Sequence, residues 1–322
     1  MTTRKIVTLL VISLTALCLI GASPKDYPLR PVQLIVPFAA GGGTDIGTRI
    51  AVKVAEKYFP KPIVVQNVDG GGSEVGVSQM VRAKPDGYTV AGFNSASITL
   101  TTMRKASYNP VTDVSPICLV VSDPRLYAVR ADDARFKTAK DFIQYARGNP
   151  EKLTIGTSGA GTSGHLSILV MNKVAQIKAK PVHFGGAGES KAAFLGGHID
   201  SVTQTYGEVL GMLKDGKVKI IAAATEERMK ELPNVPTFKE AGIDLVISSN
   251  RGFAAPKATP KAIIDKLADA FKKASADPEY IKQMEKMGLP IKYLGPEEFG
   301  KLNKREYEEY SEVVKELGVA KK

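Results

Sequence analysis

The sequence predicts an α/β protein of two lobes, each built on a sheet of mainly parallel strands that is flanked by helices. From residue 31 onward, apolar strand-like segments alternate with amphipathic helical segments, which is the pattern of parallel α/β sheets. The same order of elements, strand–helix–strand–helix–strand, occurs twice. In addition, the 322 residues exceed the size at which one hydrophobic core usually stops growing. These observations together favour two lobes.

The first unit begins with a strand predicted over residues 32–37. A helix is predicted over residues 44–59, because its apolar residues recur on one face. The remaining strand, helix and strand of this unit are predicted over residues 63–66, 73–84 and 88–93.

The second unit has the same plan. Its strands are predicted over residues 153–157, 181–184 and 199–203, and its helices over residues 164–175 and 189–195. Because strand–helix–strand connections are right-handed, each unit should form a parallel sheet.

Two apolar, extended segments flank the second unit, at residues 116–129 and 245–255. We expect them to cross between the lobes, and the mostly helical residues 256–322 to pack back on the first lobe. The expected division is therefore lobe 1 over residues 23–125 plus 247–322, and lobe 2 over residues 126–246.

The first 22 residues resemble a secretory signal peptide. A basic start is followed by an apolar run over residues 6–20 and by small residues, and cleavage is expected near Ala22. The apolar run is shorter than the roughly 20 residues of a membrane span, although an uncleaved anchor helix is the alternative. Cys18 would leave with the signal, so that Cys118, in an apolar run, is expected to be a small buried hydrophobe.

The chain carries a formal net charge of +11, and its basic residues are spread along the whole length without a run of five or more. Nucleic-acid-binding proteins usually cluster such charge on one face, so the distribution argues against a nucleic-acid partner. A diffuse positive field does favour the approach of anionic ligands.

Four predicted strand ends lead through a glycine-rich turn into a helix, at residues 37–45, 69–73, 157–164 and 185–190. Glycine lets the backbone approach a ligand closely, and the helix that follows presents unpaired N–H groups to an anion. Such turns lie at the carboxyl ends of parallel strands, where ligands normally bind. Each turn alone also fits an ordinary connection, but four together predict a shared anion site between the lobes.

Several catalytic patterns are not found. Residues Gly159–Gly164 fit the dinucleotide fingerprint G-x-G-x-x-G, but no carboxylate ends the second strand, where His183, Phe184 and Gly185 stand. The sequence has no G-x-x-x-x-G-K-[ST] motif, no G-x-S-x-G motif and no H-x-x-x-H pair. We therefore predict no catalytic residue, no metal site and no cofactor, and keep a dinucleotide-binding enzyme as the less favoured alternative.

Two polar residues allow more than one interpretation. His165, at a predicted helix start, could donate a hydrogen bond to a ligand carboxylate or simply cap the helix. Asp200, at the start of an apolar strand, is expected to have a scaffold role, because a carboxylate there is costly unless it is hydrogen-bonded.

Several motifs, in order along the chain, resemble those of one family. They are Tyr27–Pro31, Ile35–Asp45 with Arg49, Val64–Asn67, Gly70–Gly72, Pro85–Thr89, Gly196–Asp200, Gly216–Ala222 and Leu232–Phe238. Together they resemble the tripartite tricarboxylate transporter solute receptors, also called Bug proteins, over nearly the whole mature chain.

This resemblance implies a Venus-flytrap fold of the periplasmic-binding-protein type, located in the periplasm, and no enzymatic activity. It implies capture of a small organic carboxylate, either a di- or tricarboxylate, an amino acid or an aromatic acid, in the cleft between the lobes. The partners it implies are the large and small membrane subunits of an ion-driven permease, and we expect a monomer. A ligand sensor without a dedicated permease would share the same binding residues.

The resemblance also implies that backbone groups of the first glycine loop hold one carboxylate. The residues expected at the ligand site in lobe 1 are Phe38, Ala39, Ala40, Gly42, Thr44, Asp45, Gly71 and Ser95. Those in lobe 2 are Ser158, Thr162, Ser163, Gly164, His165, Gly186, Ala187 and Thr203. Arg251 stands where the family often has an aromatic residue before Gly252; it could pair with a distal carboxylate of the ligand, or it could face solvent.

Overall fold

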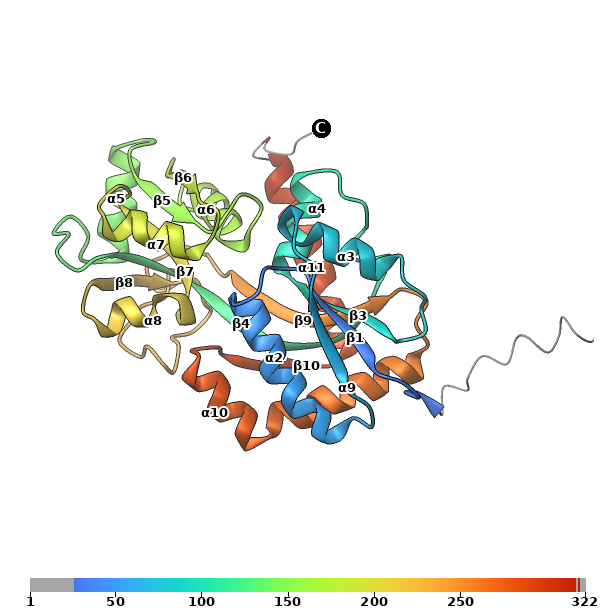
Figure 1. The fold of residues 1–322 in the computed structure, drawn as a ribbon. Helices are drawn as coiled ribbons and strands as arrows, with labels where there is room; N and C mark the ends of the chain where they lie inside the picture. Colours follow the sequence, from blue (N-terminus) through green and yellow to red (C-terminus); the bar gives the residue numbers. More distant parts are fainter. Residues whose placement is uncertain (1–25, 317, 319–322) are drawn as a thin grey trace, which may run out of the picture.

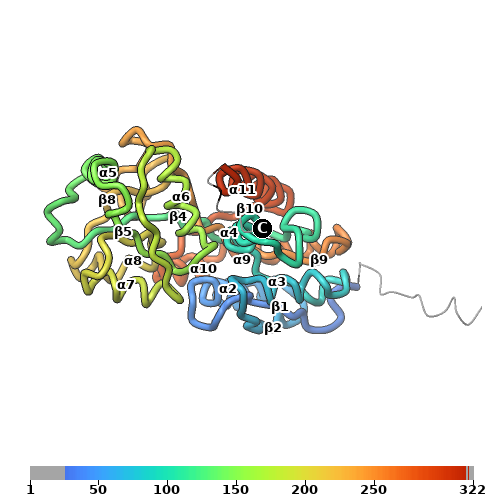
Figure 2. The backbone as a smooth tube through the Cα atoms, turned by 90° about the horizontal axis from the view of Figure 1, so that it is seen from above, coloured from blue at the N-terminus to red at the C-terminus, as the bar shows by residue number. Residues whose placement is uncertain are grey.

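The computed structural model describes residues 26–316 and 318, and it has two lobes side by side (Figure 1). The expected signal peptide, with Cys18, lies outside the described residues. Two strands join the lobes, β4 (Val114–Arg130) and β9 (Ser248–Pro256). Seen from above, the green, yellow and light-orange chain of the second lobe forms one body, and the blue, cyan and red segments lie in the other (Figure 2).

The first lobe contains both the amino-terminal and the carboxy-terminal elements. Its strands are β1 (Val32–Val36), β2 (Ile63–Asn67), β3 (Thr89–Asn94) and β10 (Ile291–Leu294). Its helices are α2 (Gly43–Ala55), η3 (Glu56–Tyr58), η4 (Gly71–Ser73), α3 (Glu74–Val81), α4 (Ser95–Met103), α9 (Lys261–Ala276), α10 (Pro278–Lys286) and α11 (Pro296–Glu316).

The second lobe is formed by the middle of the chain. Its strands, besides the end of β4, are β5 (Thr154–Thr157), β6 (Lys180–His183), β7 (Ser201–Thr205) and β8 (Val218–Ala223). Its helices are α5 (Ala139–Gly148), α6 (Ser163–Val174), α7 (Ala187–Leu195) and α8 (Tyr206–Lys214).

The strand pairing confirms a parallel sheet in each unit. Strand β1 runs parallel to β2 and β3, and β5 runs parallel to β6 and β7. The crossing strands are antiparallel to their neighbours, and the path of hydrogen-bonded strands is β2-β1-β3-β9-β4-β7-β5-β6. Helices α9 and α11 pack on β4, as expected for the carboxy-terminal segment. Strand β10, which pairs with β4, interrupts that segment and was not predicted.

The partners of β4 change along its length. Residues Val114 to Pro124 pair with β9, whereas Arg125 to Val129 pair with β7. We propose lobe limits at 125/126 and 246/247, which this change of partner and the start of β9 support.

Aromatic side chains fill the core of each lobe. In lobe 1, Phe253 on β9 stacks on Phe271 of α9, with ring centroids 4.4 Å apart. In lobe 2, the buried ring of Tyr127 lies edge-on to Phe238 at 4.9 Å. Cys118 is buried in lobe 1, as expected for a small hydrophobe.

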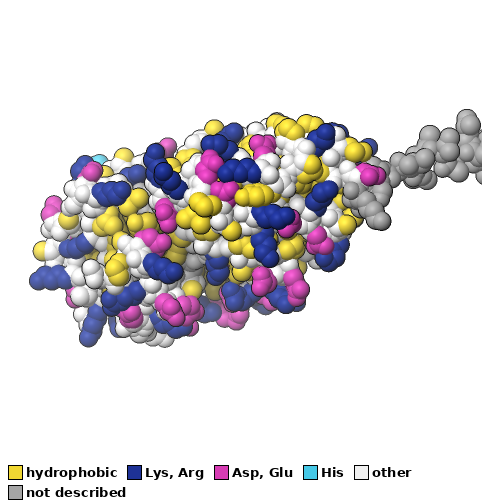
Figure 3. Space-filling model, turned by 90° about the horizontal axis from the view of Figure 1, so that it is seen from below, with side chains coloured by type: hydrophobic (Ala, Val, Ile, Leu, Met, Phe, Trp, Pro, Cys, Tyr) yellow, Lys and Arg dark blue, Asp and Glu magenta, His cyan; other side chains and the backbone are white. Residues whose placement is uncertain are grey.

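The surface seen from below carries basic and acidic side chains interspersed over both lobes (Figure 3). This arrangement agrees with the spread of basic residues along the sequence. Among the helices that the structure describes, none combines the length and the apolar character needed to cross a bilayer.

Candidate ligand-binding site

A cavity of about 580 Å³ lies between the lobes and is lined by loops from both. It brings together eleven of the residues expected at the ligand site. They are Phe38, Ala39, Ala40, Gly42, Thr44, Ser158, Thr162, Ser163, Gly186, Ala187 and Arg251. The cavity therefore lies where residues of all four glycine-rich turns meet, because Asp69, at the start of the second turn, lines it as well.

Helix N-termini converge on this cavity. Helix α2 begins at its wall with Gly43, α6 with Ser163 and α7 with Ala187. Helix α4 contributes its cap Asn94 and its residue Ala96. Because each helix start carries unpaired N–H groups and the positive end of a dipole, four of them around one space favour an anionic guest.

The first glycine loop is held in shape by Asp45. Its carboxylate accepts hydrogen bonds from the backbone N–H of Gly41, which has a φ of +81°, and from Arg49 and Asn67, each at 2.9 Å. Burial alone would raise the pKa of Asp45, but the hydrogen bonds from Gly41, Asn67 and Arg49 outweigh it and lower the pKa. Arg49 also balances the charge, so the loop presents backbone N–H groups without a free carboxylate.

In lobe 2, the turn between β5 and α6 is held by Thr162 and His165. The Thr162 hydroxyl donates to Gly159 O at 2.8 Å and accepts from the N–H of His165, while the Gly161 N–H donates to Nδ1 of His165 at 3.2 Å. Burial, and secondly the nearby His183, lower the pKa of His165 to about 4. The ring is thus neutral at pH 7, and since Nδ1 accepts, its proton is on Nε2.

His165 and Gly71 line a second, smaller cavity of about 330 Å³. It shares Phe38, Ala96 and Thr162 with the larger cavity, so the two are neighbouring parts of one cleft. Arg104 also lines the smaller cavity. Its guanidinium donates a hydrogen bond to Gly71 O and forms an ion pair with Glu74, with an N–O distance of 2.9 Å. His165 therefore supports its turn and also lines the cleft, and a hydrogen bond from it to a ligand carboxylate stays a prediction.

Four expected residues line neither cavity. Asp45 is buried behind the first loop, as described above. The Ser95 hydroxyl is turned inward to Glu306, at 3.2 Å. Gly164 and Thr203 are buried behind the wall, where Gly164 lies against Thr157 and Arg125. These four residues thus lie behind the wall of the cavity, and their direct contact with a ligand stays a prediction.

Two arginines line the larger cavity. Arg251 is only 9% exposed, so the solvent-facing alternative for it is wrong, and its Nη1 donates to Asp123 at 3.0 Å. Arg125, which the sequence analysis missed, is 4% exposed and donates from Nε and Nη2 to Ser163 Oγ. Burial lowers the pKa of Arg125, although the nearby carboxylates of Glu208 and Asp123 act to raise it. Burial likewise raises the pKa of Asp123, although the charge of Arg251 acts to lower it.

Asp200 has the scaffold role expected for it. Its carboxylate accepts from the N–H and hydroxyl of Thr154 and pairs with Arg135 at 2.7 Å. Among the described residues, no group of three His, Cys, Asp or Glu side chains is placed to hold a metal ion.

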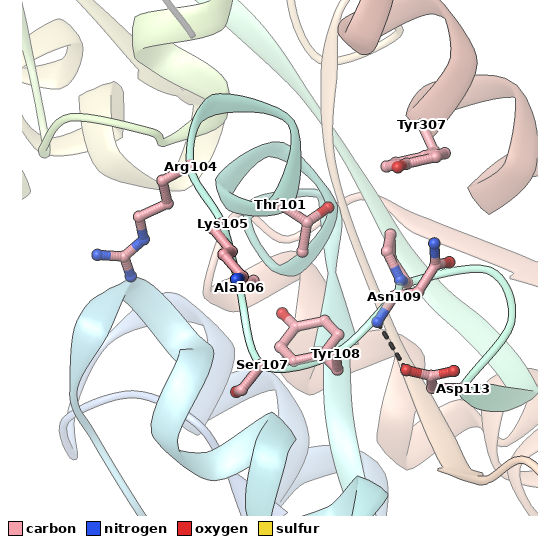
Figure 4. Close-up of a pocket in the computed structure, with 10 residues that line it drawn as sticks. Thr101, Arg104, Lys105, Ala106, Ser107, Tyr108, Asn109, Asp113 and Tyr307 are labelled. Carbon is pink, nitrogen blue, oxygen red and sulfur yellow. Dashed lines mark hydrogen bonds between the residues drawn. The ribbon is translucent and has the colours of Figure 1, made fainter. Parts of the chain in front are cut away.

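Another hollow, of about 370 Å³, lies outside the cleft, between the end of α4 and α11 (Figure 4). Its polar groups serve the local turn, as in the hydrogen bond from the Asn109 N–H to Asp113 at 2.8 Å. The Arg104 side chain points away from Tyr307 there (Figure 4). None of the residues expected at the ligand site lines this hollow.

Comparison with known families adds the deciding observation. The model of the tripartite tricarboxylate transporter family receptors, TctC, matches residues 48–319. The chain belongs to this receptor family. Members of the family are solute-binding receptors rather than enzymes; they are periplasmic, bind small carboxylates and work with tripartite tricarboxylate transporters.

Relatives of this receptor are similar over almost their whole length. A UPF0065 protein from the gbd 5′ region of Cupriavidus necator is 32% identical, over 93% of this chain and 91% of that protein. A solved TctC solute-binding protein from Polaromonas is 31% identical with a TM-score of 0.79, covering 90% of this chain and 99% of that one. MatC from Rhodopseudomonas palustris, solved with bound malate, is 27% identical with a TM-score of 0.79, covering 89% and 100%. These matches confirm the two-lobed fold.

Behind the cleft of the receptor, the carboxyl of Glu306 on α11 is buried between α4 and β9. Its Oε1 accepts from Ser95 at 3.2 Å and from Asn250 Nδ2 at 2.6 Å, and among the described residues no cation pairs with it. Burial raises the pKa of Glu306 to about 7, against the hydrogen bonds from Asn250, Tyr310 and Ser95.

This pKa predicts a pH-dependent stability. The folded-state pKa lies above the ordinary value of 4.5, so the contribution of Glu306 is fully present below pH 4.5 and is lost as the pH rises to about 7. The free energy of unfolding should fall by about 3 kcal/mol over this pH range, at roughly 1.4 kcal/mol per pKa unit. We expect Glu306→Gln to become progressively more stable than the parent between pH 4.5 and pH 8, as measured by urea unfolding. A stability difference between the two proteins that stays constant across this pH range would contradict the raised pKa of Glu306.

Proposed function

We propose that this receptor captures a small organic carboxylate in the cleft between its lobes and delivers it to the large and small permease subunits of a tripartite tricarboxylate transporter. It would act as a periplasmic monomer, after removal of a signal peptide near Ala22. The convergence of four helix N-termini on one cavity between the lobes carries this proposal.

The wall of the cavity supports an anionic guest in two ways. The loops before α2 and α7 contribute Gly42 and Gly186, whose lack of a side chain leaves the adjacent backbone N–H groups accessible. Two buried arginines offer charged donors at the same wall, where the carboxylates of Asp69 and Glu208 also lie. MatC, which holds malate in its structure, has the same fold at 27% identity.

We propose that the ligand is contacted by those residues that were expected from the sequence and that line the two cavities. The lobes would close over the ligand by bending at the crossing strands. Backbone N–H donors and the two arginines can together bind a carboxylate in this cavity. Release to the permease subunits then requires only that the lobes open again.

Calorimetric titration tests the proposal. The protein is unfolded and refolded to strip any bound acid, then titrated with di- and tricarboxylates, amino acids and aromatic acids. We expect saturable heat, with one ligand per chain, for at least one acid. The absence of heat with every acid would contradict carboxylate capture, and uptake by vesicles holding the two permease subunits tests delivery.

A further inference from the structure

The two arginines at the cavity come from the two strands that join the lobes. Arg125 is on β4 and Arg251 on β9, and both side chains are at least nine-tenths buried. A buried guanidinium that lines a cavity needs acceptors, because its charge has lost most of its water. The acceptors around each guanidinium therefore decide what else it can bind.

Each arginine lies against the start of a different helix. A Cβ built on Gly43, the first residue of α2, would lie 3.5 Å from Nη2 of Arg251. A Cβ built on Gly164, at the start of α6, would lie 3.5 Å from Nη1 of Arg125. A helix N-terminus is the positive end of the dipole, so a neighbouring cation is unfavourable there and an anion is favoured. In this cleft, a buried arginine lies beside a helix N-terminus once in each lobe.

The two carboxylates nearby, Asp123 and Glu208, match the formal charge of these two cations, and each of them also accepts a hydrogen bond from a backbone N–H. Asp123 accepts from Arg251 Nη1 but also from the N–H of Tyr206, at 3.2 Å. Glu208 lies 3.7 Å from Arg125 Nη1 and accepts from the N–H of Thr205, at 2.8 Å. Both carboxylates thus also serve the start of α8.

Beside each of the two arginines, hydrogen-bond donors remain that have no acceptor among the described residues. Of the Arg251 guanidinium, only Nη1 donates a hydrogen bond to another described residue, so Nε and Nη2 have no acceptor among them. Ser163 Oγ accepts twice from Arg125, from Nε at 3.2 Å and from Nη2 at 2.6 Å. Since both of its lone pairs are occupied, the hydroxyl must direct its own proton elsewhere, and Ser163 lines the cavity.

We propose that Arg251 and Arg125 determine specificity and select a ligand with two carboxylates, one at Arg251 and the start of α2, the other at Arg125, Ser163 and the start of α6. This inference rests on the proposed function and narrows it to dicarboxylates. A ligand bridging the two places would link the lobes and thereby favour their closure.

The test compares a diacid with its monoamide, which has nearly the same shape and one charge fewer. Succinate, malate, glutarate and adipate are titrated first, and the tightest binder is then compared with its monoamide. We expect the parent protein to prefer the diacid by about 10- to 100-fold, since charge-assisted hydrogen bonds are roughly twice as strong as neutral ones. Equal affinity of the parent for the two compounds would overturn the inference, even if no variant folds.

Two paired variants then assign the preference to the arginines. Arg251→Gln with Asp123→Asn, and Arg125→Gln with Glu208→Gln, remove each cation together with its partner, so that no buried charge is left alone. We expect each pair to reduce the preference for the diacid to less than about threefold, with monoamide affinity changed much less than diacid affinity. Paired variants that fold and keep the parent preference would overturn the inference.

Failure of this inference differs from failure of the proposed function. If carboxylates bind but the second carboxylate brings no gain, the role of the arginines is wrong and carboxylate capture stands. If no acid in the panel binds the parent protein, the proposed function itself fails.

Discussion

Gly252→Ala is expected to destabilise the protein by about 3 kcal/mol or more, at the upper end of the range for overpacked cores. Gly252 lies on the crossing strand β9, between Phe93 of β3 and Leu119 of β4. A Cβ there would lie 2.2 Å from the carbonyl oxygen of Cys118 and 2.7 Å from the ring of Phe299. The carbonyl belongs to a strand paired on both sides, so it cannot move without breaking the sheet that joins the lobes.

Gly300→Ala is the matched control. Gly300 is inside α11, and its added Cβ would lie 3.5 Å from Pro116, an ordinary van der Waals contact. Alanine in a helix interior is favoured over glycine by up to about 1 kcal/mol, so this variant should be as stable as the parent or more so. Urea unfolding measures both variants. Equal midpoints for the two would show that β9 is not packed as described.

The second large effect concerns binding. Ala187→Asp is expected to reduce carboxylate affinity at least 100-fold without lowering the melting temperature. Ala187 is the first residue of α7 and lines the cavity. Two like charges 4 Å apart repel by about 4 kcal/mol at an effective dielectric constant of 20, while each tenfold change in affinity corresponds to about 1.4 kcal/mol. An aspartate in the first turn of a helix is itself favourable, so the fold should not suffer.

Ala187→Asn separates charge from size, since asparagine has nearly the same shape as aspartate and no charge. Calorimetry should show that the asparagine variant loses carboxylate affinity by a factor at least ten times smaller than the aspartate variant does. Equal losses would mean that the side chain blocks the cleft by its volume. Unchanged affinity in both variants would place the ligand away from α7.

Much of the fold could be predicted from the sequence because the repeated alternation of strand and helix is a local pattern. The parallel pairing of β1 with β3 and of β5 with β7 follows from it. Helix α4 was missed because its residues, Ser95–Met103, include no charged residue and show no amphipathic period. Its N-terminus nonetheless reaches the cleft, through Asn94 and Ala96.

The glycine-rich turns predicted most of the residues that line the candidate site, since a turn after a parallel strand lies at a known edge of the sheet. The direction of single side chains could not be predicted in this way. Ser95 turns inward because Glu306, 211 residues further along the chain, accepts its hydrogen bond. Arg125 lies in an otherwise mostly apolar strand, and only the pairing of β4 with β7 places it beside the cleft. A charged residue within a predicted crossing strand is the signal that could have indicated it.

A crystal structure of the protein with its tightest-binding acid tests the central claim most directly. We predict that each carboxylate of the ligand lies in the cavity between the lobes, about 3 Å from a backbone N–H group at the start of α2, α6 or α7. An acid bound at saturation anywhere else, with this cavity holding only water, would contradict the account.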